Sequence, residues 1–261
     1  MLHYYALSKA LGREQPFYAL QSIGLDGECE PLRSIESMAA RYIEQIRRVQ
    51  PEGPYGLGGH SLGGQIAYEM ARQLTQVGQE VAHLVVMDTF APGGKAAPIG
   101  ADWDDARWML ELIDTIEQFL GIQLGVEHAT LANLGVESQI ELVAAKLHLV
   151  NAIPPGAGVG MLRGLFRVFQ ANNQTDYQPP APLQLAVPIT LFRGTESGDS
   201  GVKPELRADP AWGWGACSTM PVGLHFVSGD HIGMMTEPHV RMLGVHLKEL
   251  LEAPQIISQT L

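Results

Sequence analysis

The stretch at residues 55–64, "YGLGGHSLGG", decides how the rest of the chain is interpreted. It contains the pattern G-x-S-x-G, in which Ser61 is flanked by Gly59 and Gly63. A serine in this pattern occupies a tight turn between a strand and a helix, and its neighbours must be small because other backbone comes close. The short run before Ser61 suits a buried strand, and an amphipathic helix follows it. The apolar positions of that helix are Ile66, Met70, Leu74 and Val77.

The same stretch permits a second interpretation. Residues 57–62, "LGGHSL", resemble the sequence around the serine of carrier domains that receives a phosphopantetheine arm. Ser61 would then be an attachment point and not a nucleophile. Carrier domains are helical bundles much shorter than this chain, and they have no place for a valine-rich strand that ends in Asp88. The length and the surrounding pattern therefore favour the nucleophile.

Residues 1–88 alternate between helix and strand patterns. An opening helix is expected to end at Gly12, and "PFYALQSIGL" predicts a short strand around Phe17. Ser34 suits the N-cap of the next helix, and the valine-rich run at 81–87 predicts a buried strand. Alternation of this kind predicts a parallel sheet covered by helices on both faces.

The middle of the chain has a different pattern, because residues 103–153 are predicted to be entirely helical. Strand patterns return only with "PITLFRG" at 188–194 and "LHFVSGDH" at 224–231. A helical run that interrupts such an alternation indicates an insertion, and helical insertions above a sheet commonly serve as lids. The sequence therefore predicts one α/β domain, residues 1–261, with a helical lid insertion at about 95–180.

A catalytic serine needs a general base, and the base needs an acid to orient it. In α/β-hydrolases these residues follow the chain order serine, aspartate or glutamate, then histidine. His231 is the expected base, because it follows a strand-like run, has Gly229 to permit a turn, and precedes the last helix. His60 is next to Ser61, but we expect its side chain to point away from the chemistry.

Asp88 is the favoured acid, because it ends the strand that follows the nucleophile helix. Its carboxylate is expected at the carboxyl edge of the sheet, where the active sites of α/β proteins lie. Glu196 and Asp199 are the alternatives, since they follow the strand pattern "PITLFRG". The spacing from Ser61 favours Asp88 but leaves the other two open.

The helix that begins after Ser61 also offers a site for a developing negative charge. The first N–H groups of a helix have no acceptor within it, and the helix dipole is positive at that end. The backbone N–H of Leu62 is therefore the expected oxyanion-hole donor.

Composition excludes several other functions. The chain has 261 residues and a formal net charge of −11 with no block of Lys or Arg, so a nucleic-acid partner is not expected. Cys29 and Cys217 have no metal-binding spacing, and neither a metal nor a bound cofactor is predicted. No apolar run approaches the roughly 18 residues of a membrane span, and the N-terminus is unlike a signal peptide, so we expect a cytoplasmic protein.

Four segments together resemble the terminal, type I thioesterase domains of nonribosomal peptide synthetases. They are "GPYGLGGHSLGGQIAYEMARQL", "LVVMDTFAP", "SQIELVAAKLHLVNAIPPGA" and "VSGDHIGMMTEPHV", and they are spread over most of the chain. The resemblance implies an α/β-hydrolase fold with Asp88 as the acid. It also implies that Ser61 takes over an acyl or peptidyl chain held as a thioester on the phosphopantetheine of a carrier domain. That carrier domain is expected upstream in the same synthetase. Water or an internal nucleophile would then release the chain as an acid or a macrocycle, with His231 as base and then acid.

The sequence differs from the family pattern at its start. Family members begin with a strand and a loop of the kind "FCIHPAGG", which donates the second oxyanion N–H, whereas this sequence starts inside the helix "LHYYALSKALG". We therefore expect the first family strand and the oxyanion loop to be missing, and the activity to be reduced. Two further functions stay open: a free-standing carboxylesterase or lipase, and a truncated remnant without catalysis.

Overall fold

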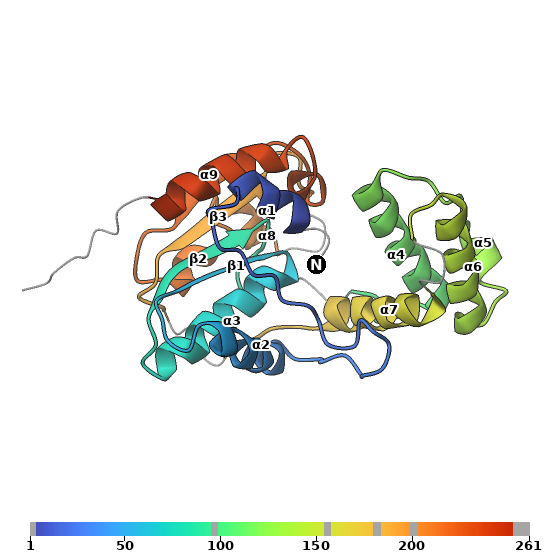
Figure 1. Ribbon diagram of the computed structural model, residues 1–261, viewed down its shortest axis with the longest axis horizontal. Helices are drawn as coiled ribbons and strands as arrows, with labels where there is room; N and C mark the ends of the chain where they lie inside the picture. The colour runs from blue at the N-terminus through green and yellow to red at the C-terminus, as the bar shows by residue number, and fades with distance from the viewer. Residues whose placement is uncertain (1–3, 95–98, 154–157, 180–183, 199–202, 253–261) are drawn as a thin grey trace, which may run out of the picture.

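The computed structural model describes residues 4–94, 99–153, 158–179, 184–198 and 203–252. Its centre is a parallel sheet with the strand order β1-β2-β3-β4 (Figure 1). The strands are β1 (Tyr55–His60), β2 (Val81–Met87), β3 (Ile189–Gly194) and β4 (Gly223–Val227). Since neighbouring strands are parallel, their carboxyl ends meet at one edge of the sheet, which is the edge where Ser61 and Asp88 follow β1 and β2.

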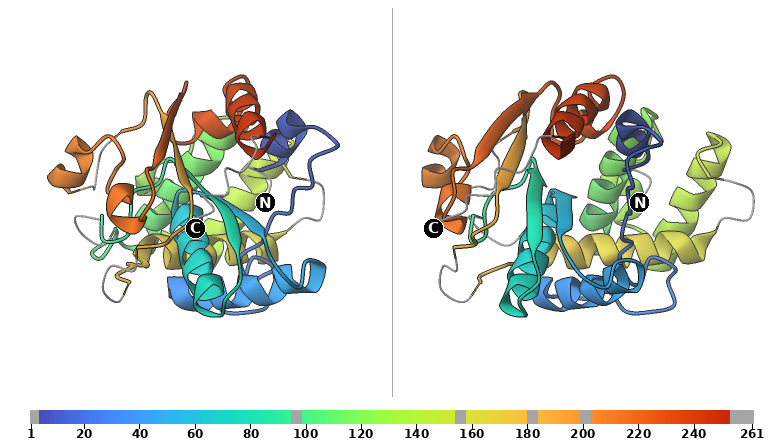
Figure 2. Two further views of the ribbon diagram at one scale, coloured as in Figure 1. Left: turned by 90° about the vertical axis from the view of Figure 1, so that its left-hand side faces the viewer. Right: turned by 60° about the vertical axis from the view of Figure 1, so that its left-hand side comes forward.

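Helices cover both faces of the sheet, as the alternation of patterns predicted. Helices α2 (Ile35–Val49) and α3 (Leu62–Gln76) pack on one face, and α1 (Tyr5–Leu11) and α9 (Val240–Glu252) pack on the other. Figure 2 shows α9 on the opposite side of the sheet from α2 and α3. The remaining short helices are α8 (Pro204–Ala208), η2 (Trp214–Cys217) and η3 (Gly233–Met235).

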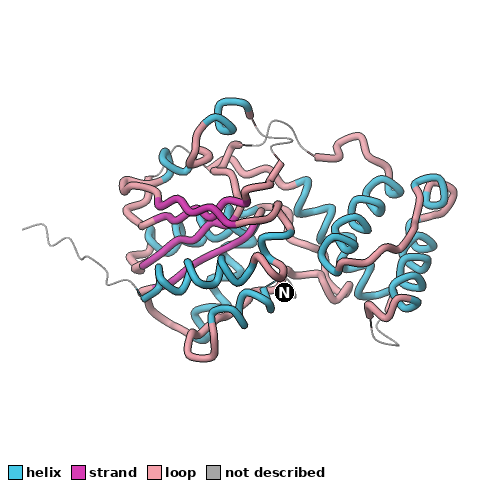
Figure 3. Tube along the Cα trace, turned by 90° about the horizontal axis from the view of Figure 1, so that it is seen from above, coloured by secondary structure: helices cyan, strands magenta, loops and turns pink. Residues whose placement is uncertain are grey.

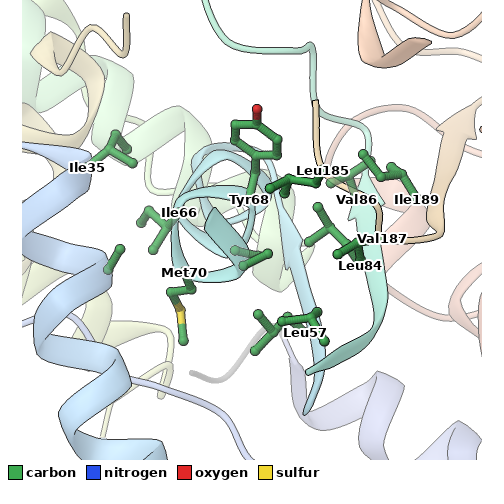
Figure 4. Close-up of a cluster of buried hydrophobic side chains, with 14 of the residues drawn as sticks. Ile35, Leu57, Ile66, Tyr68, Met70, Leu84, Val86, Leu185, Val187 and Ile189 are labelled. Carbon is green, nitrogen blue, oxygen red and sulfur yellow. The ribbon is translucent and has the colours of Figure 1, made fainter. Parts of the chain in front are cut away.

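Strand β2 shows why residues 84–87, "LVVM", are an unbroken apolar run. Leu84 and Val86 belong to the core cluster formed with α2 and α3, part of which is drawn in Figure 4. Val85 and Met87 belong to the cluster formed with α1 and α9. Because successive side chains point to opposite faces and both faces are covered, no position in the middle of this strand is open to a polar residue.

The helix boundaries largely follow the predicted signals, but one predicted strand is wrong. Ser34 caps α2 by accepting a hydrogen bond from the Ser37 N–H, and α1 ends before Gly12, whose φ is 88°. The segment around Phe17 forms no strand. Phe17 packs against the α1–α9 cluster, whereas the neighbouring Tyr18 is 70% exposed. A strand requires a ladder partner, and within the described ranges none pairs with this segment.

The predicted helical insertion consists of α4 (Asp105–Leu120), α5 (His128–Leu131), α6 (Val136–Leu149) and α7 (Val159–Gln174). These helices enclose their own apolar cluster, and Figure 3 shows that they lie to one side of the strands. Members of this cluster include Trp108, Leu112, Ile140, Leu147 and Phe166.

Helix α7 joins the insertion to the rest of the chain by close backbone contact. A Cβ atom on Gly164 would lie 2.5 Å from the carbonyl oxygen of Gly24 and 2.6 Å from the nitrogen of Gly27, so only glycine fits there. Arg167 forms an ion pair with Glu30 beside this contact, with 3.0 Å between Nη1 and Oε1. The loop at residues 24–30 therefore holds α7 in place.

A buried carboxylate forms a second connection between the insertion and the sheet region. Glu69 of α3 is fully buried and accepts two hydrogen bonds of 2.6 Å from Arg72 and one from Tyr177, which follows α7. Burial alone would raise the pKa of Glu69, but the hydrogen bonds from Arg72 and Tyr177 outweigh it, so the pKa is below its ordinary value. An ionised Glu69 thus ties the segment after α7 to the nucleophile helix.

We predicted above that the first family strand and the oxyanion loop are missing. Because this concerns positions ahead of Met1, it stays a prediction.

The tight turn at Ser61 predicts that alanine substitutions at two glycines of β1 differ greatly in their effect on the free energy of unfolding. A Cβ atom on Gly59 would lie 2.0 Å from the carbonyl oxygen of Gly63, whereas one on Gly56 would meet nothing within 4 Å. We expect Gly59→Ala to lower the free energy of unfolding by more than about 2 kcal/mol, because the turn must shift. Gly56→Ala should change it by less than about 0.5 kcal/mol. Urea unfolding followed by circular dichroism measures both, and equal midpoints would contradict this account of the turn.

Candidate active site

Ser61 occupies the sharp turn that the sequence predicted, between the end of β1 and the start of α3. Its backbone has φ 55° and ψ −129°, a region that non-glycine residues rarely adopt and that costs about 1–3 kcal/mol. Hydrogen bonds hold this conformation: the Ser61 N–H donates to the Met87 carbonyl at 3.0 Å, and the Ser61 carbonyl accepts from the Gly64 N–H at 2.9 Å. The parallel sheet and this strand–turn–helix geometry are incompatible with the helical carrier bundle.

Thr89 supports the turn from the neighbouring strand end. Its hydroxyl lies 2.8 Å from the carbonyl oxygen of Ser61 and 2.9 Å from that of Met87, so it can donate to either. A Cβ atom on Gly64 would lie 2.5 Å from the Thr89 hydroxyl oxygen, which explains the second glycine after the serine. The sequence pattern did not predict this role of Thr89.

Asp88 and His231 are in direct contact. Nδ1 of His231 lies 2.7 Å from Oδ2 of Asp88. Asp88 is buried and has φ 48°, whereas 41% of the His231 side chain is exposed. The pair therefore combines a carboxylate shielded from solvent with an imidazole that other molecules can reach.

Three donors surround the Asp88 carboxylate. Besides His231, the Gly194 N–H donates to Oδ1 at 2.9 Å and the Ser197 hydroxyl donates to Oδ2 at 2.7 Å. Burial would raise the pKa of Asp88, but these hydrogen bonds more than compensate, and the pKa is lower than its ordinary value. Asp88 is therefore ionised at neutral pH.

The alternative acids do not take this position in the described part of the chain. Glu196 is exposed, and its N–H donates to the carbonyl of Gly229 at 3.0 Å. Asp199 lies outside the described residues. Ser197, between them, is the residue of this loop that contacts Asp88, and nothing in its sequence context indicated that contact.

His60, the residue before Ser61, contacts His231. Ser61 and His231 themselves are not hydrogen-bonded to each other in the described structure. His60 Nε2 lies 2.7 Å from the carbonyl oxygen of His231, and the ring centroids of the two histidines are 4.5 Å apart. The prediction that His60 points away from the site was therefore wrong. Among the hydrogen bonds of the described residues, none joins the Ser61 hydroxyl to the His231 imidazole.

Leu62 is the first residue of α3, directly after Ser61. Its N–H is one of the N-terminal groups that have no acceptor within the helix, and it lies at the positive end of the helix dipole. The role of this N–H as an oxyanion donor stays a prediction.

The described ranges contain neither a membrane-spanning helix nor a cluster of metal-ligating side chains. The helices described there include none that is long and apolar enough to cross a membrane. Over the same ranges, His, Cys, Asp and Glu side chains form no group of three that could hold a metal ion. Cys29 and Cys217 are free thiols.

The chain belongs to the thioesterase domain family, whose pattern matches residues 1–247. It is 30% identical over 260 residues to chondramide synthase of Chondromyces crocatus, covering 94% of this chain and 6% of that protein. It is 24% identical over 262 residues to indigoidine synthase of Dickeya dadantii, covering 97% and 16%. The chain thus spans only a small part of the curated relatives it matches.

Solved structures have the same fold. The chain is similar to a four-domain nonribosomal peptide synthetase, with a TM-score of 0.82, 27% identity, and coverage of 97% of this chain and 19% of that one. It is also similar to the Vlm2 thioesterase domain, with a TM-score of 0.64, 20% identity, and coverage of 97% and 90%. The predicted α/β-hydrolase fold and the predicted family are confirmed. The chain is a thioesterase domain of the kind found in nonribosomal peptide and polyketide synthases.

The low pKa of Asp88 predicts how this residue contributes to stability as pH changes. A carboxyl group whose pKa is depressed on folding stabilises the native state above its unfolded pKa, and this contribution is lost as pH falls through the folded pKa. The ordinary value is 3.8. We therefore expect the difference in unfolding free energy between the wild type and Asp88→Asn to be largest above about pH 5 and to shrink below about pH 3.8.

Urea unfolding at several pH values measures this difference. Asp114→Asn, an exposed change on α4, is the matched control and should show a small difference throughout. A difference for Asp88→Asn that stays constant down to pH 2.5 would show that ionisation of this carboxyl does not stabilise the fold.

Proposed function

We propose that this chain is a serine hydrolase in which Ser61 is the nucleophile, His231 the general base and Asp88 the orienting acid. The observation that carries the proposal is the Asp88–His231 hydrogen bond beside the strained Ser61 turn. An ionised carboxylate only accepts hydrogen bonds, so Nδ1 of His231 carries the proton. Nε2 is then the basic nitrogen, available to take the proton of the Ser61 hydroxyl.

The chemistry follows in two halves. Ser61 Oγ attacks the carbonyl carbon of a thioester while His231 Nε2 takes its proton, and the N–H of Leu62 donates to the oxyanion. When the tetrahedral intermediate collapses, the carbon–sulfur bond breaks and His231 returns the proton to the departing thiol. Water or a nucleophile within the bound chain then attacks the Ser61 ester, which releases an acid or a macrocycle. Attack requires the Ser61 hydroxyl to lie within hydrogen-bonding distance of His231 Nε2.

The proposed substrate is an acyl or peptidyl chain carried on the phosphopantetheine of a carrier domain, with that domain upstream in the same synthetase. The support is the family together with relatives that are peptide or polyketide synthases. We also propose that the chain is one domain whose helical insertion, about residues 95–180, is a lid over the site. The separate apolar cluster of helices α4–α7 supports this role.

The nucleophile is tested with a fluorophosphonate probe, which reacts with activated serines. We expect labelling of the wild type at Ser61, none in Ser61→Ala, and labelling slowed at least about 10³-fold in His231→Ala, since the base is lost. Ser138→Ala and His148→Ala, both on α6, are the controls and should label like the wild type. Unchanged labelling of Ser61→Ala, with a folded protein, would contradict the assignment of the nucleophile.

The substrate class is tested by comparing thioesters with simple esters. We expect kcat/KM for an acyl thioester of a phosphopantetheine carrier to exceed that for p-nitrophenyl esters by at least tenfold, because recognition extends beyond the reacting bond. A preference for p-nitrophenyl esters would favour a free-standing carboxylesterase. No turnover of either, with no probe labelling, would favour a remnant without catalysis.

A further inference from the structure

His60 contacts His231 in two separate ways. Its Nε2 lies 2.7 Å from the backbone oxygen of His231, and its ring packs against the His231 ring at a centroid distance of 4.5 Å and an angle of 33°. His60 is 9% exposed, so the His60 side of both contacts is largely buried. With Asp88 holding Nδ1, the imidazole of His231 is constrained at its ring edge, on one ring face and through its own backbone.

The hydrogen bond defines the protonation of His60. A backbone carbonyl oxygen only accepts, so Nε2 of His60 must carry a hydrogen. A carbonyl in this part-buried position is stabilised by a partner, since a polar group that is withdrawn from water and left unpaired is costly. The His60 side chain supplies that partner and fixes how closely the His231 backbone approaches the end of β1.

The backbone of His60 is held at the same time. Its N–H donates to the hydroxyl of Tyr4, at the start of α1, at 3.0 Å. The next residue is Ser61, whose N–H is bonded to Met87 of β2. Tyr4 and β2 therefore fix the main chain from which both the His60 side chain and the Ser61 side chain project.

The segment that carries His231 lies between β4 and η3 and is ordered mainly by local bonds. Asp230 Oδ1 accepts from the N–H groups of Ile232 and Gly233 at 3.1 Å and 2.6 Å. These bonds shape the turn but do not set its distance from β1. Contacts to other segments do so: the Glu196 N–H donates to the Gly229 carbonyl at 3.0 Å, and His231 contacts Asp88 and His60, of which His60 belongs to the strand that leads to Ser61.

We propose that His60 is a positioning residue that sets the distance between Ser61 and His231 by donating from Nε2 to the His231 carbonyl. The proposal rests on the proposed function, in which Ser61 and His231 exchange a proton. Because His60 and Ser61 are adjacent in the chain, the hydrogen bond from His60 to the His231 carbonyl also fixes the position of Ser61 relative to His231. Misplacing a catalytic group by about 1 Å costs on the order of 10²-fold in rate.

Three substitutions separate the hydrogen bond from the ring contact. His60→Gln keeps an N–H donor at about the position of Nε2 but loses the ring. His60→Phe keeps a ring but loses the donor, and His60→Ala loses both. His148→Ala is the control on a histidine far from these contacts in sequence, on α6.

The first readout is the second-order rate of fluorophosphonate labelling at Ser61, with kcat and KM for an acyl thioester. We expect His60→Phe and His60→Ala to lose ten- to hundredfold in labelling rate and kcat with KM nearly unchanged. His60→Gln should stay within about threefold of the wild type. The Gln and Phe variants fill the buried space, so their comparison stands even if the Ala variant does not fold.

The second readout does not depend on activity. The proton on His231 Nδ1, hydrogen-bonded to Asp88, is expected as a far-downfield resonance in the proton NMR spectrum. It should shift or broaden in His60→Phe and be retained in His60→Gln and His148→Ala.

The outcomes separate this inference from the proposed function. If the wild type is not labelled at Ser61, the proposed function fails, and the NMR comparison still decides whether His60 positions His231. If the wild type is labelled and all His60 variants match it, the inference is overturned. It is equally overturned if the Gln variant loses activity while the Phe variant keeps it, because the ring and not the hydrogen bond would then do the positioning.

Discussion

The hydrogen bond from His231 Nδ1 to Asp88 Oδ2 spans 143 positions of the chain, and the arrangement of the site depends on it. It forms only because parallel strands bring their carboxyl ends to one edge, so that the residues after β2 and β4 meet. The Gly194 N–H, at the end of β3, donates to the same carboxylate. Asp88 thereby joins the ends of three strands, and its buried charge is tolerated because the Gly194 N–H, the Ser197 hydroxyl and His231 Nδ1 all donate hydrogen bonds to it.

Two residues with a strained backbone lie at the same edge. Ser61 and Asp88 are both non-glycine residues with positive φ, and each directly follows a strand. Such conformations persist only where the surroundings hold them. Met87 and Thr89, on either side of Asp88, supply hydrogen bonds to the Ser61 turn, so the two strained residues are held by one short segment of chain. The geometry that exposes the serine and the geometry that aims the carboxylate are therefore coupled.

The sequence predicted those site residues that lie within a recognisable local pattern of neighbouring residues. Ser61 could be found from its glycines, and the strand that precedes Asp88 from its valine-rich run at residues 84–87, because both reflect backbone constraints. His60 and Ser197 could not be found this way, since their roles arise from side chains that meet across distant segments. The strand expected at Phe17 failed for a related reason: propensity is local, whereas a strand exists only beside a partner.

Mass spectrometry of the acyl-enzyme tests the central claim most directly, namely that Asp88 and His231 activate Ser61 toward thioesters. The chain would be mixed briefly with an acyl-phosphopantetheine thioester, quenched in acid and digested. The account predicts an acyl adduct on the peptide that contains Ser61, abundant in the wild type and strongly reduced in Asp88→Asn. Release of free thiol with no adduct at Ser61, or with the adduct on another residue, would contradict it.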